Sequence, residues 1–272
     1  GIGALQSSDS MISNSTIGDM TLGFISDSNV TLVFLPTGFV SRWGLYENNI
    51  VNNAYVNLTL HNTSIGKWWI SARDNSVLSL TGITTGTVYA DECSIVSITN
   101  STIGYVWAVW NSTVYLFDSK ISSLEMGTDG CPTVFLTNST YSVLSWIEWG
   151  GGNPKVYVAW YLDLSVMDSR GLPLPDVPVE AYWENGTLLV QTCTNDDGWA
   201  RLILYEKRIV YSYGEIIFRY ANYTVKVRYG CYTDEKLIES INDNTKINIT
   251  LPAALPCMHV CLHGWRYPFH LY

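Results

Sequence analysis

Residues 98–108 read ITNSTIGYVWA, residues 116–126 read LFDSKISSLEM and residues 136–146 read LTNSTYSVLSW. Each stretch alternates apolar and polar residues, turns at a polar residue, and alternates again. Seven segments align on that turn residue, and their turn positions are 23, 25, 20, 18, 18 and 20 residues apart. The seven turn residues are Asn14, Thr37, Asn62, Gly82, Asn100, Asp118 and Asn138. Repeats of about this length are typical of solenoid folds.

The columns around the turn keep a constant chemical character. Two residues before it stand Ile12, Leu35, Leu60, Leu80, Ile98, Leu116 and Leu136, all aliphatic. Six residues after it stand Met20, Trp43, Trp68, Val88, Val106, Leu124 and Leu144. A unit this short cannot bury its own apolar stripe, so successive units must stack, with backbones pairing at about 4.8 Å per layer. We therefore expect an all-β chain that begins with a parallel, right-handed β-helix of about seven rungs over residues 1–152. A β-sandwich is the alternative fold. A leucine-rich-repeat fold is disfavoured because its fixed Leu consensus is absent from the sequence.

The pattern ends at residues 150–154, GGGNP, which we interpret as a linker or corner. Residues 168–179 then read DSRGLPLPDVPV, and residues 194–200 read TNDDGWA. These two motifs resemble those of Ig-like and carboxypeptidase-regulatory-like β-sandwich modules of secreted surface proteins. The resemblance covers roughly residues 155–252 and implies an Ig-like sandwich over 153–252, of a kind that serves as a spacer, adhesive or assembly unit. A C-terminal tail, 253–272, follows.

Composition restricts the compartment and the partners. The chain of 272 residues has a formal net charge of −9 and only 14% charged residues, which argues against nucleic-acid binding. No apolar run is long enough for a membrane span, and the chain opens with GIGA, which we interpret as a mature N-terminus left after signal-peptide removal. The six cysteines are compatible with an oxidising compartment. We expect a secreted, extracellular or cell-surface protein.

Asn-x-Ser/Thr sequons are dense, and we predict covalent N-glycans. The ten sites are Asn14, Asn29, Asn57, Asn62, Asn100, Asn111, Asn138, Asn185, Asn222 and Asn248. Sequon asparagines occupy the turn column in alternate repeats, which predicts a row of sugars along one edge of the solenoid. The competing explanation is that Asn and Thr suit turns and strands.

The cysteines give several disulfide candidates and one weak metal candidate. Cys93 and Cys131 share a column two layers apart, about 9.6 Å, which is too far for a disulfide unless the extra residues 127–130 bend that turn. The disulfide candidates are Cys193, Cys231, Cys257 and Cys261, with Cys193 and Cys231 able to bridge near strand ends. Cys257, His259, Cys261 and His263 can point to one face of an extended strand and share a metal ion. We favour disulfide formation and docking of the aromatic tail, and we expect no metal or other cofactor.

The combination of an acidic, Tyr-, Thr- and Trp-rich chain, many sequons, a β-solenoid and an Ig-like module resembles archaeal secreted proteins of surface layers and extracellular filaments. That resemblance implies a structural subunit. A solenoid also ends in an open rung of unpaired backbone groups, which predicts head-to-tail self-assembly. The alternative is a monomer in which residues 1–10 cover the rung.

Two other functions remain open. An adhesin or carbohydrate-binding protein can use exposed aromatics, among them Trp68, Trp69, Trp107 and Trp110. A polysaccharide-active β-helix enzyme needs clustered bases and carboxylates, whereas this half of the chain holds only Arg42, Lys67, Arg73 and Lys120 as bases, with scattered acids. The pair Asp91 and Glu92 suits Ca²⁺ or an ordinary turn. We therefore expect no enzymatic activity and name no catalytic residue.

Overall fold

The structure is a computed structural model that describes residues 2–4, 9–13, 19–24, 29–34, 42–50, 55–72 and 77–253, with side chains described for Ala72 and residues 77–253. Every regular element in these ranges is a β-strand. The chain forms two compact units: Gly1–Val158 with Arg208–Phe218, and Ala159–Lys207 with Arg219–Tyr272.

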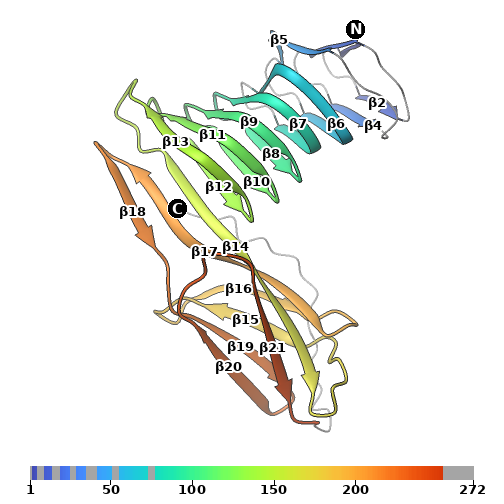
Figure 1. Cartoon of the computed structure of the whole chain (residues 1–272), viewed down its shortest axis with the longest axis vertical. Helices are drawn as coiled ribbons and strands as arrows, with labels where there is room; N and C mark the ends of the chain where they lie inside the picture. Colours follow the sequence, from blue (N-terminus) through green and yellow to red (C-terminus); the bar gives the residue numbers. More distant parts are fainter. Residues whose placement is uncertain are drawn as a thin grey trace. The chain divides into compact units, whose positions relative to one another are not determined.

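The first thirteen strands build the coils of the first unit (Figure 1). They are β1 (Ile2–Ala4), β2 (Asp9–Ser13), β3 (Asp19–Phe24), β4 (Asn29–Phe34), β5 (Arg42–Ile50), β6 (Tyr55–Ala72), β7 (Val77–Ala90), β8 (Ile95–Thr99), β9 (Thr102–Ala108), β10 (Thr113–Phe117), β11 (Lys120–Gly127), β12 (Thr133–Thr137) and β13 (Thr140–Ile147). The later strands are β14 (Lys155–Asp168), β15 (Pro178–Tyr182), β16 (Leu188–Cys193), β17 (Trp199–Tyr211), β18 (Glu215–Arg219), β19 (Tyr223–Tyr229), β20 (Tyr232–Ile238) and β21 (Thr245–Leu251).

The first unit is a β-solenoid with parallel pairing. Strands β8, β10 and β12 stack on one face, and β9, β11 and β13 stack on the other (Figure 1). Strand β7 is long enough to pair with both β8 and β9. Four coils, formed by β7, β8–β9, β10–β11 and β12–β13, therefore follow one another, and the ladder continues through β6, β4 and β2.

Like residues stack on like residues inside these coils. Ile98, Leu116 and Leu136 lie in register and are fully buried. Val88, Val106 and Leu124 form a second buried column on the other face. The predicted alignment of these columns is confirmed, because alternation with period two sends the same position of every repeat into the core.

The alignment of the second and third repeats needs a correction. Leu80 pairs with Leu58, which pairs with Leu32, where the sequence predicted Leu60 and Leu35. Val88 likewise pairs with Ile70 rather than Trp68. These repeats are longer, and β6 takes up the excess in two register irregularities, Thr59/Thr63 and Ile65/Trp69. At Leu58 and Ile70 the shift is two residues, which keeps the period-two alternation in phase, so the apolar pattern alone did not expose it. At Leu32 the shift is three residues.

The C-terminal end of the solenoid is closed along one of its two faces. Strand β14 follows β12 in the sheet, and the Lys155 N–H donates to the Pro132 carbonyl at 3.0 Å. On the other face, Trp146 replaces the smaller Ala108 and Met126 of its column and stacks on Tyr211, with ring centroids 5.2 Å apart. The Trp146 Nε1–H also donates to Glu215 Oε1 at 2.8 Å. At this end of the solenoid, β13 is the strand that has no second neighbour within the described residues. The open rung predicted before Ile12, at the other end, stays a prediction.

The glycine-rich segment after β13 is a packed turn and not an extended linker. The Gly152 N–H donates to the Thr128 carbonyl at 2.7 Å, and Thr128 Oγ1 donates to the Gly150 carbonyl at 3.0 Å. A Cβ on Gly152 would lie 1.6 Å from the Gly130 carbonyl oxygen. Glycine is required because this turn stacks directly on the turn of the preceding coil.

The second unit has a four-stranded antiparallel sheet of order β16-β15-β19-β20. Its core contains buried residues from several strands, among them Leu164 of β14, Val179 of β15, Leu202 of β17, Val225 of β19 and Ile249 of β21. Parallel pairing of β14 with β21 brings together segments about eighty residues apart in the sequence. This core therefore depends on contacts between distant segments.

The two sequence motifs of this unit mark turns. Asp168 is 3% exposed, and its Oδ1 accepts the backbone N–H groups of Arg170 at 2.8 Å and Leu172 at 3.0 Å. The Leu172 N–H and the Arg170 side chain and backbone N–H hold the pKa of Asp168 below its usual value, against the opposing effect of burial. Thr194 is also buried, and its Oγ1 accepts the Val177 N–H at 2.9 Å.

Candidate functional site

One row of polar turns runs along the solenoid at the junction of its two faces. Gly82, Asn100, Asp118 and Asn138 occupy it in consecutive coils, and all four have positive φ, between 46° and 67°. Gly, Asn and Asp are the residues that adopt this left-handed conformation most readily. The turn stereochemistry therefore accounts for the residue types in this column.

The residue after each polar turn forms a buried serine ladder, made by Ser101, Ser119 and Ser139. The Ser101 N–H donates to Ser119 Oγ at 3.1 Å, and the Ser119 N–H donates to Ser139 Oγ at 3.0 Å. The Ile83 N–H donates to Ser101 Oγ at 3.2 Å in the same way. Each hydroxyl donates in turn to the carbonyl two residues earlier, as Ser119 Oγ does to Phe117 at 2.7 Å. Sequence reasoning missed this ladder, although aligned serines at position 101, 119 and 139 were its signal.

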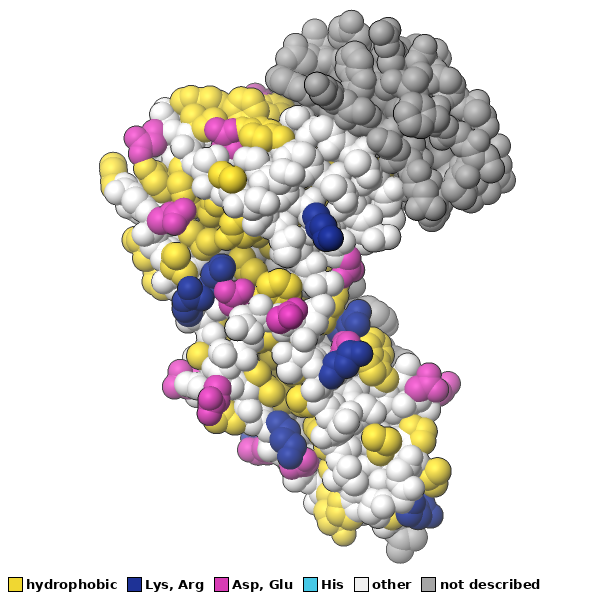
Figure 2. Space-filling model, viewed as in Figure 1, with side chains coloured by type: hydrophobic (Ala, Val, Ile, Leu, Met, Phe, Trp, Pro, Cys, Tyr) yellow, Lys and Arg dark blue, Asp and Glu magenta, His cyan; other side chains and the backbone are white. Residues whose placement is uncertain are grey.

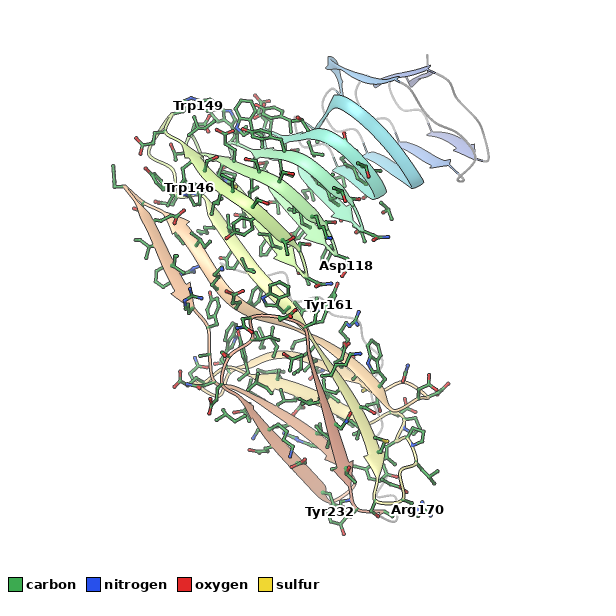
Figure 3. All side chains as sticks on the ribbon, viewed as in Figure 1. Asp118, Trp146, Trp149, Tyr161, Arg170 and Tyr232 are labelled. Carbon is green, nitrogen blue, oxygen red and sulfur yellow. The ribbon has the colours of Figure 1, made fainter. Side chains whose placement is uncertain are left out.

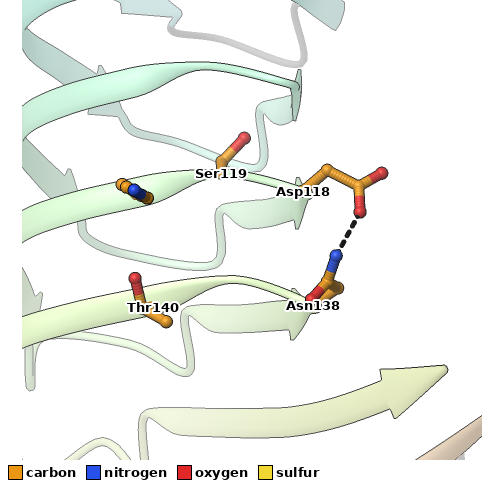
Figure 4. A pocket seen from close by; sticks show the side chains of 5 residues that line it. Asp118, Ser119, Asn138 and Thr140 are labelled. Carbon is orange, nitrogen blue, oxygen red and sulfur yellow. Dashed lines mark hydrogen bonds between the residues drawn. The ribbon is translucent and has the colours of Figure 1, made fainter. Parts of the chain in front are cut away.

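The turn row has a shallow pocket between its last two coils, lined by Asp118, Ser119, Lys120, Asn138 and Thr140 (Figure 4). The Asn138 Nδ2–H donates to Asp118 Oδ1 at 2.6 Å across the layers. The Asn-Ser-Thr sequence at 138–140 thus has structural causes: a left-handed turn, a buried hydroxyl and the first residue of a strand. Glycosylation of these asparagines stays a prediction.

The other sequons fall in different settings. Asn100, Asn111, Asn185 and Asn248 are exposed, and Asn222 is half-buried with Nδ2 donating to Glu184 Oε1 at 3.3 Å. Asn111 Oδ1 accepts the Cys131 N–H at 3.1 Å. Asn29, Asn57 and Asn62 lie in β4 and β6, where only the backbone is described, and Asn14 lies outside the described residues.

Aromatic side chains gather on the outer surface of the solenoid, and we name Tyr89, Tyr105, Trp107 and Trp149 the aromatic surface. Trp107 lies at the centre, with ring centroids 4.9 Å from Tyr89, 6.5 Å from Tyr105 and 5.5 Å from Trp149. Trp149 is 54% exposed, at the end of the coils (Figure 3). Figure 2 shows hydrophobic side chains gathered over this part of the chain.

A carboxylate lies beside the aromatic surface. Glu125 is the cross-strand neighbour of Trp107, and partial burial raises its pKa. The Trp107 Nε1–H is buried and makes no hydrogen bond within the described part of the chain. Trp110 lies on the next turn and is exposed. Trp68 and Trp69, the other two aromatics proposed from the sequence, lie in β6, where side chains are not described.

The hairpin of β17 and β18 forms a second candidate surface. Tyr213, at its tip, is 98% exposed with φ of 55°, and all five side chains of β18 are exposed. The sequence placed these residues in the predicted sandwich of 153–252 and gave no sign that residues 208–218 group with the solenoid. The reason is that the contact of Tyr211 with Trp146 joins residues 65 positions apart.

The cysteines differ in whether their sulfur is a free thiol or part of a disulfide. Cys93 and Cys131 carry free, exposed thiols, which confirms that they do not pair with each other. Cys193 is disulfide-bonded. Its strand β16 and the strand β19 that precedes Cys231 are separated by β15, about 9.6 Å by strand spacing. That distance exceeds the Cα separation of a disulfide, so the predicted pairing of Cys193 with Cys231 does not fit the sheet order.

The proposed metal ligands Cys257, His259, Cys261 and His263 lie outside the described residues. Within residues 77–253 and the described N-terminal strands, no group of three or more His, Cys, Asp or Glu side chains could hold a metal ion. Asp91 serves a turn: its Oδ2 accepts the Tyr89 hydroxyl at 3.1 Å and its Oδ1 accepts the Glu92 N–H at 2.9 Å. No helix that could cross a membrane occurs in the part of the chain that is described.

Comparison with known proteins gives little beyond the geometry. No family model and no curated protein matches the chain. Among solved structures, the Bacillus anthracis TIE protein is similar at 18% sequence identity with a TM-score of 0.28. The match covers 40% of this chain and only 18% of that chain, so it contributes nothing to the functional argument.

Proposed function

We propose that this protein is a structural subunit of an extracellular assembly, a filament or surface lattice, and that it carries N-glycans on its sequons. One observation carries the proposal: β13 and β18, at the two ends of the main path of the largest sheet, have no further neighbour within the described residues. An uncovered edge strand presents unpaired N–H and C=O groups, which a strand of another chain satisfies. Val143 on β13 is 53% exposed and adds an apolar contact.

The rigid solenoid suits this role. Its strands stack in register, so each coil positions the next, and a head-to-tail contact at β13 prolongs the same stacking into another copy. We also propose that the coils wind right-handedly, because crossovers between parallel strands almost always have that hand. For the second unit we propose an Ig-like sandwich, supported by its antiparallel sheet and by the turn roles of Asp168 and Thr194.

Electron microscopy of native material tests the proposal, and we expect ordered polymers. A charged residue on the free edge strand, Val143→Lys, should shorten or abolish them, because lysine on an edge opposes strand addition. Ser122→Lys is the matched control, since Ser122 is exposed on β11, which has neighbours on both sides. Monodisperse monomers at every concentration, in native and recombinant protein alike, would refute assembly.

The aromatic surface favours a second candidate, carbohydrate binding by a surface adhesin. Sugar rings stack on exposed aromatic faces, and carboxylates such as Glu125 accept bonds from sugar hydroxyls. A glycan array should then show binding that Trp149→Ala removes and Trp199→Ala, an exposed tryptophan of the second unit, preserves. Absence of any glycan binding by the unmodified protein would remove this candidate.

A further inference from the structure

Strand β18 has an unusual composition for a free sheet edge. It reads EIIFR, pairs with β17, and has no other strand beside it within the described residues. Ile216, Ile217 and Phe218 are 45%, 48% and 42% exposed. Edge strands of natural proteins are usually protected against pairing with another chain by a lysine, a proline, a β-bulge or a very short length. Strand β18 instead carries three consecutive large apolar residues between a single acid and a single base.

The hydrogen-bonding pattern of the β17–β18 hairpin shows which residues of β18 direct their backbone N–H and C=O groups away from β17, toward the free edge. The Ser212 N–H donates to the Gly214 carbonyl at 3.0 Å, and the Tyr220 N–H donates to the Glu206 carbonyl at 2.9 Å. Hydrogen-bonded pairs alternate along an antiparallel ladder, so residues 214, 216, 218 and 220 bond toward β17. The N–H and C=O groups of Glu215, Ile217 and Arg219 therefore point outward.

These outward groups are complementary to themselves. In an antiparallel pair of two β18 strands centred on Ile217, Glu215 lies opposite Arg219 of the second copy, and Ile216 lies opposite Phe218. Both ends then match acid with base, and every outward residue meets an outward residue, which allows about six backbone hydrogen bonds. A one-residue shift would place residues whose backbone groups point outward opposite residues whose backbone groups bond to β17. Parallel pairing would place Glu215 beside Glu215 and Arg219 beside Arg219 of the second copy.

We propose that β18 pairs with β18 of a second copy of this chain, antiparallel and centred on Ile217, through a two-fold axis. This inference rests on the proposed assembly function and specifies one of its contacts. A two-fold contact alone closes as a dimer, so a lattice also requires a second contact such as the head-to-tail one at β13. The intrachain partners are compatible with it: Trp146 occupies one oxygen of Glu215, and Arg219 lies 3.5 Å from Glu206 with 69% of its side chain exposed.

Disulfide trapping of the full chain tests the register. Hydrogen-bonded antiparallel partners have Cα atoms about 5.5 Å apart, within disulfide range, so Ile217→Cys should give a covalent dimer under mild oxidation. Ile216→Cys is the matched control, because residue 216 faces residue 218 of the second copy and is too far from its own counterpart. The unmodified protein controls for the native thiols of Cys93 and Cys131. Equal cross-linking of the two variants would overturn the register.

A charge exchange tests the pairing without cysteine. Glu215→Arg and Arg219→Glu should each weaken dimerisation about tenfold or more, because each sets two like-charged pairs across the axis. The double variant should recover to within a few-fold of the unmodified protein in sedimentation equilibrium. It lacks both intrachain contacts, to Trp146 and to Glu206, so recovery requires the contact between copies.

The outcomes separate this inference from the assembly function. Ordered polymers that persist in both single charge variants, without cross-linking at 217, would refute the β18 contact and leave assembly intact. A trapped two-fold dimer in protein that never polymerises would support the β18 contact and refute the filament or lattice.

Discussion

The two units of this chain are built on opposite principles. In the solenoid, a residue's neighbours are its own equivalents about 18 to 20 positions away, as Ile98, Leu116 and Leu136 show. In the second unit, Leu164 pairs with Ile247 across the sequence, and the strand order is β16-β15-β19-β20. Stability in a solenoid is a sum over adjacent layers, whereas the second unit needs all its distant segments at once. Local damage should therefore have different consequences in each.

The largest expected effect is steric and concerns the closing turn of the solenoid. Gly152→Ala should lower the free energy of unfolding by about 3 kcal/mol, because the Cβ would lie 1.6 Å from the Gly130 carbonyl oxygen and backbone must move. Gly151→Ala is the control, since a Cβ there meets nothing within 4 Å. Chemical denaturation measures both, and a similar loss in the two variants would show that the turns do not stack as described.

The serine ladder should give the next effect. Ser119→Ala leaves the buried Ser101 N–H without its acceptor, which should cost about 1 to 3 kcal/mol. Hydrogen exchange should increase at Ser101 and its neighbouring coils first, as expected of a fold stabilised layer by layer. Ser122→Ala, at an exposed position on the strand β11 that follows Ser119, should leave both stability and exchange unchanged.

In the second unit, a single carboxylate should influence the whole core. Asp168→Asn removes the ion pair with Arg170 and weakens the turn before β15. Because the pKa of Asp168 is lowered in the folded state, its contribution is present above the ordinary aspartate value of 3.8 and is lost as the pH falls through the folded pKa. The difference in melting temperature between wild type and variant should therefore be greatest near neutral pH and narrow below pH 3.8. A constant difference across that range would contradict the assignment; Asp197→Asn, on an exposed turn, is the control.

The smallest expected effect concerns Glu125, and it is a gain in stability where the preceding substitutions cause a loss. Burial beside Trp107 raises its pKa above the ordinary value of 4.5, so the ionised form opposes folding above that pKa. Glu125→Gln should raise the melting temperature slightly at pH 7, and the gain should vanish below pH 4.5. Thermal unfolding at both pH values measures it, and a loss of stability at pH 7 would show that the carboxylate makes a favourable contact instead.

Prediction from the sequence succeeded where a residue's environment repeats. The positions of the turns, the aliphatic core columns and the separation of Cys93 from Cys131 all follow from one alignment. It failed where the repeat length changes, as in the register of Leu58 with Leu80, because a two-residue slip leaves the buried face the same. It also missed the serine ladder, since serine at a turn does not reveal whether its hydroxyl accepts from the next layer.

Period-two alternation and a recurring turn residue determined by themselves that the first half of this chain winds into stacked parallel coils, because each short apolar stripe can be buried only by its neighbours. The tertiary structure alone decided how the last coil ends: Tyr211 and Glu215 reach Trp146 from a hairpin more than sixty residues later. It also decided that β13 and β18 each keep a free edge among the described strands. Sequence spacing carries no information about such contacts, since they join segments that share no repeat.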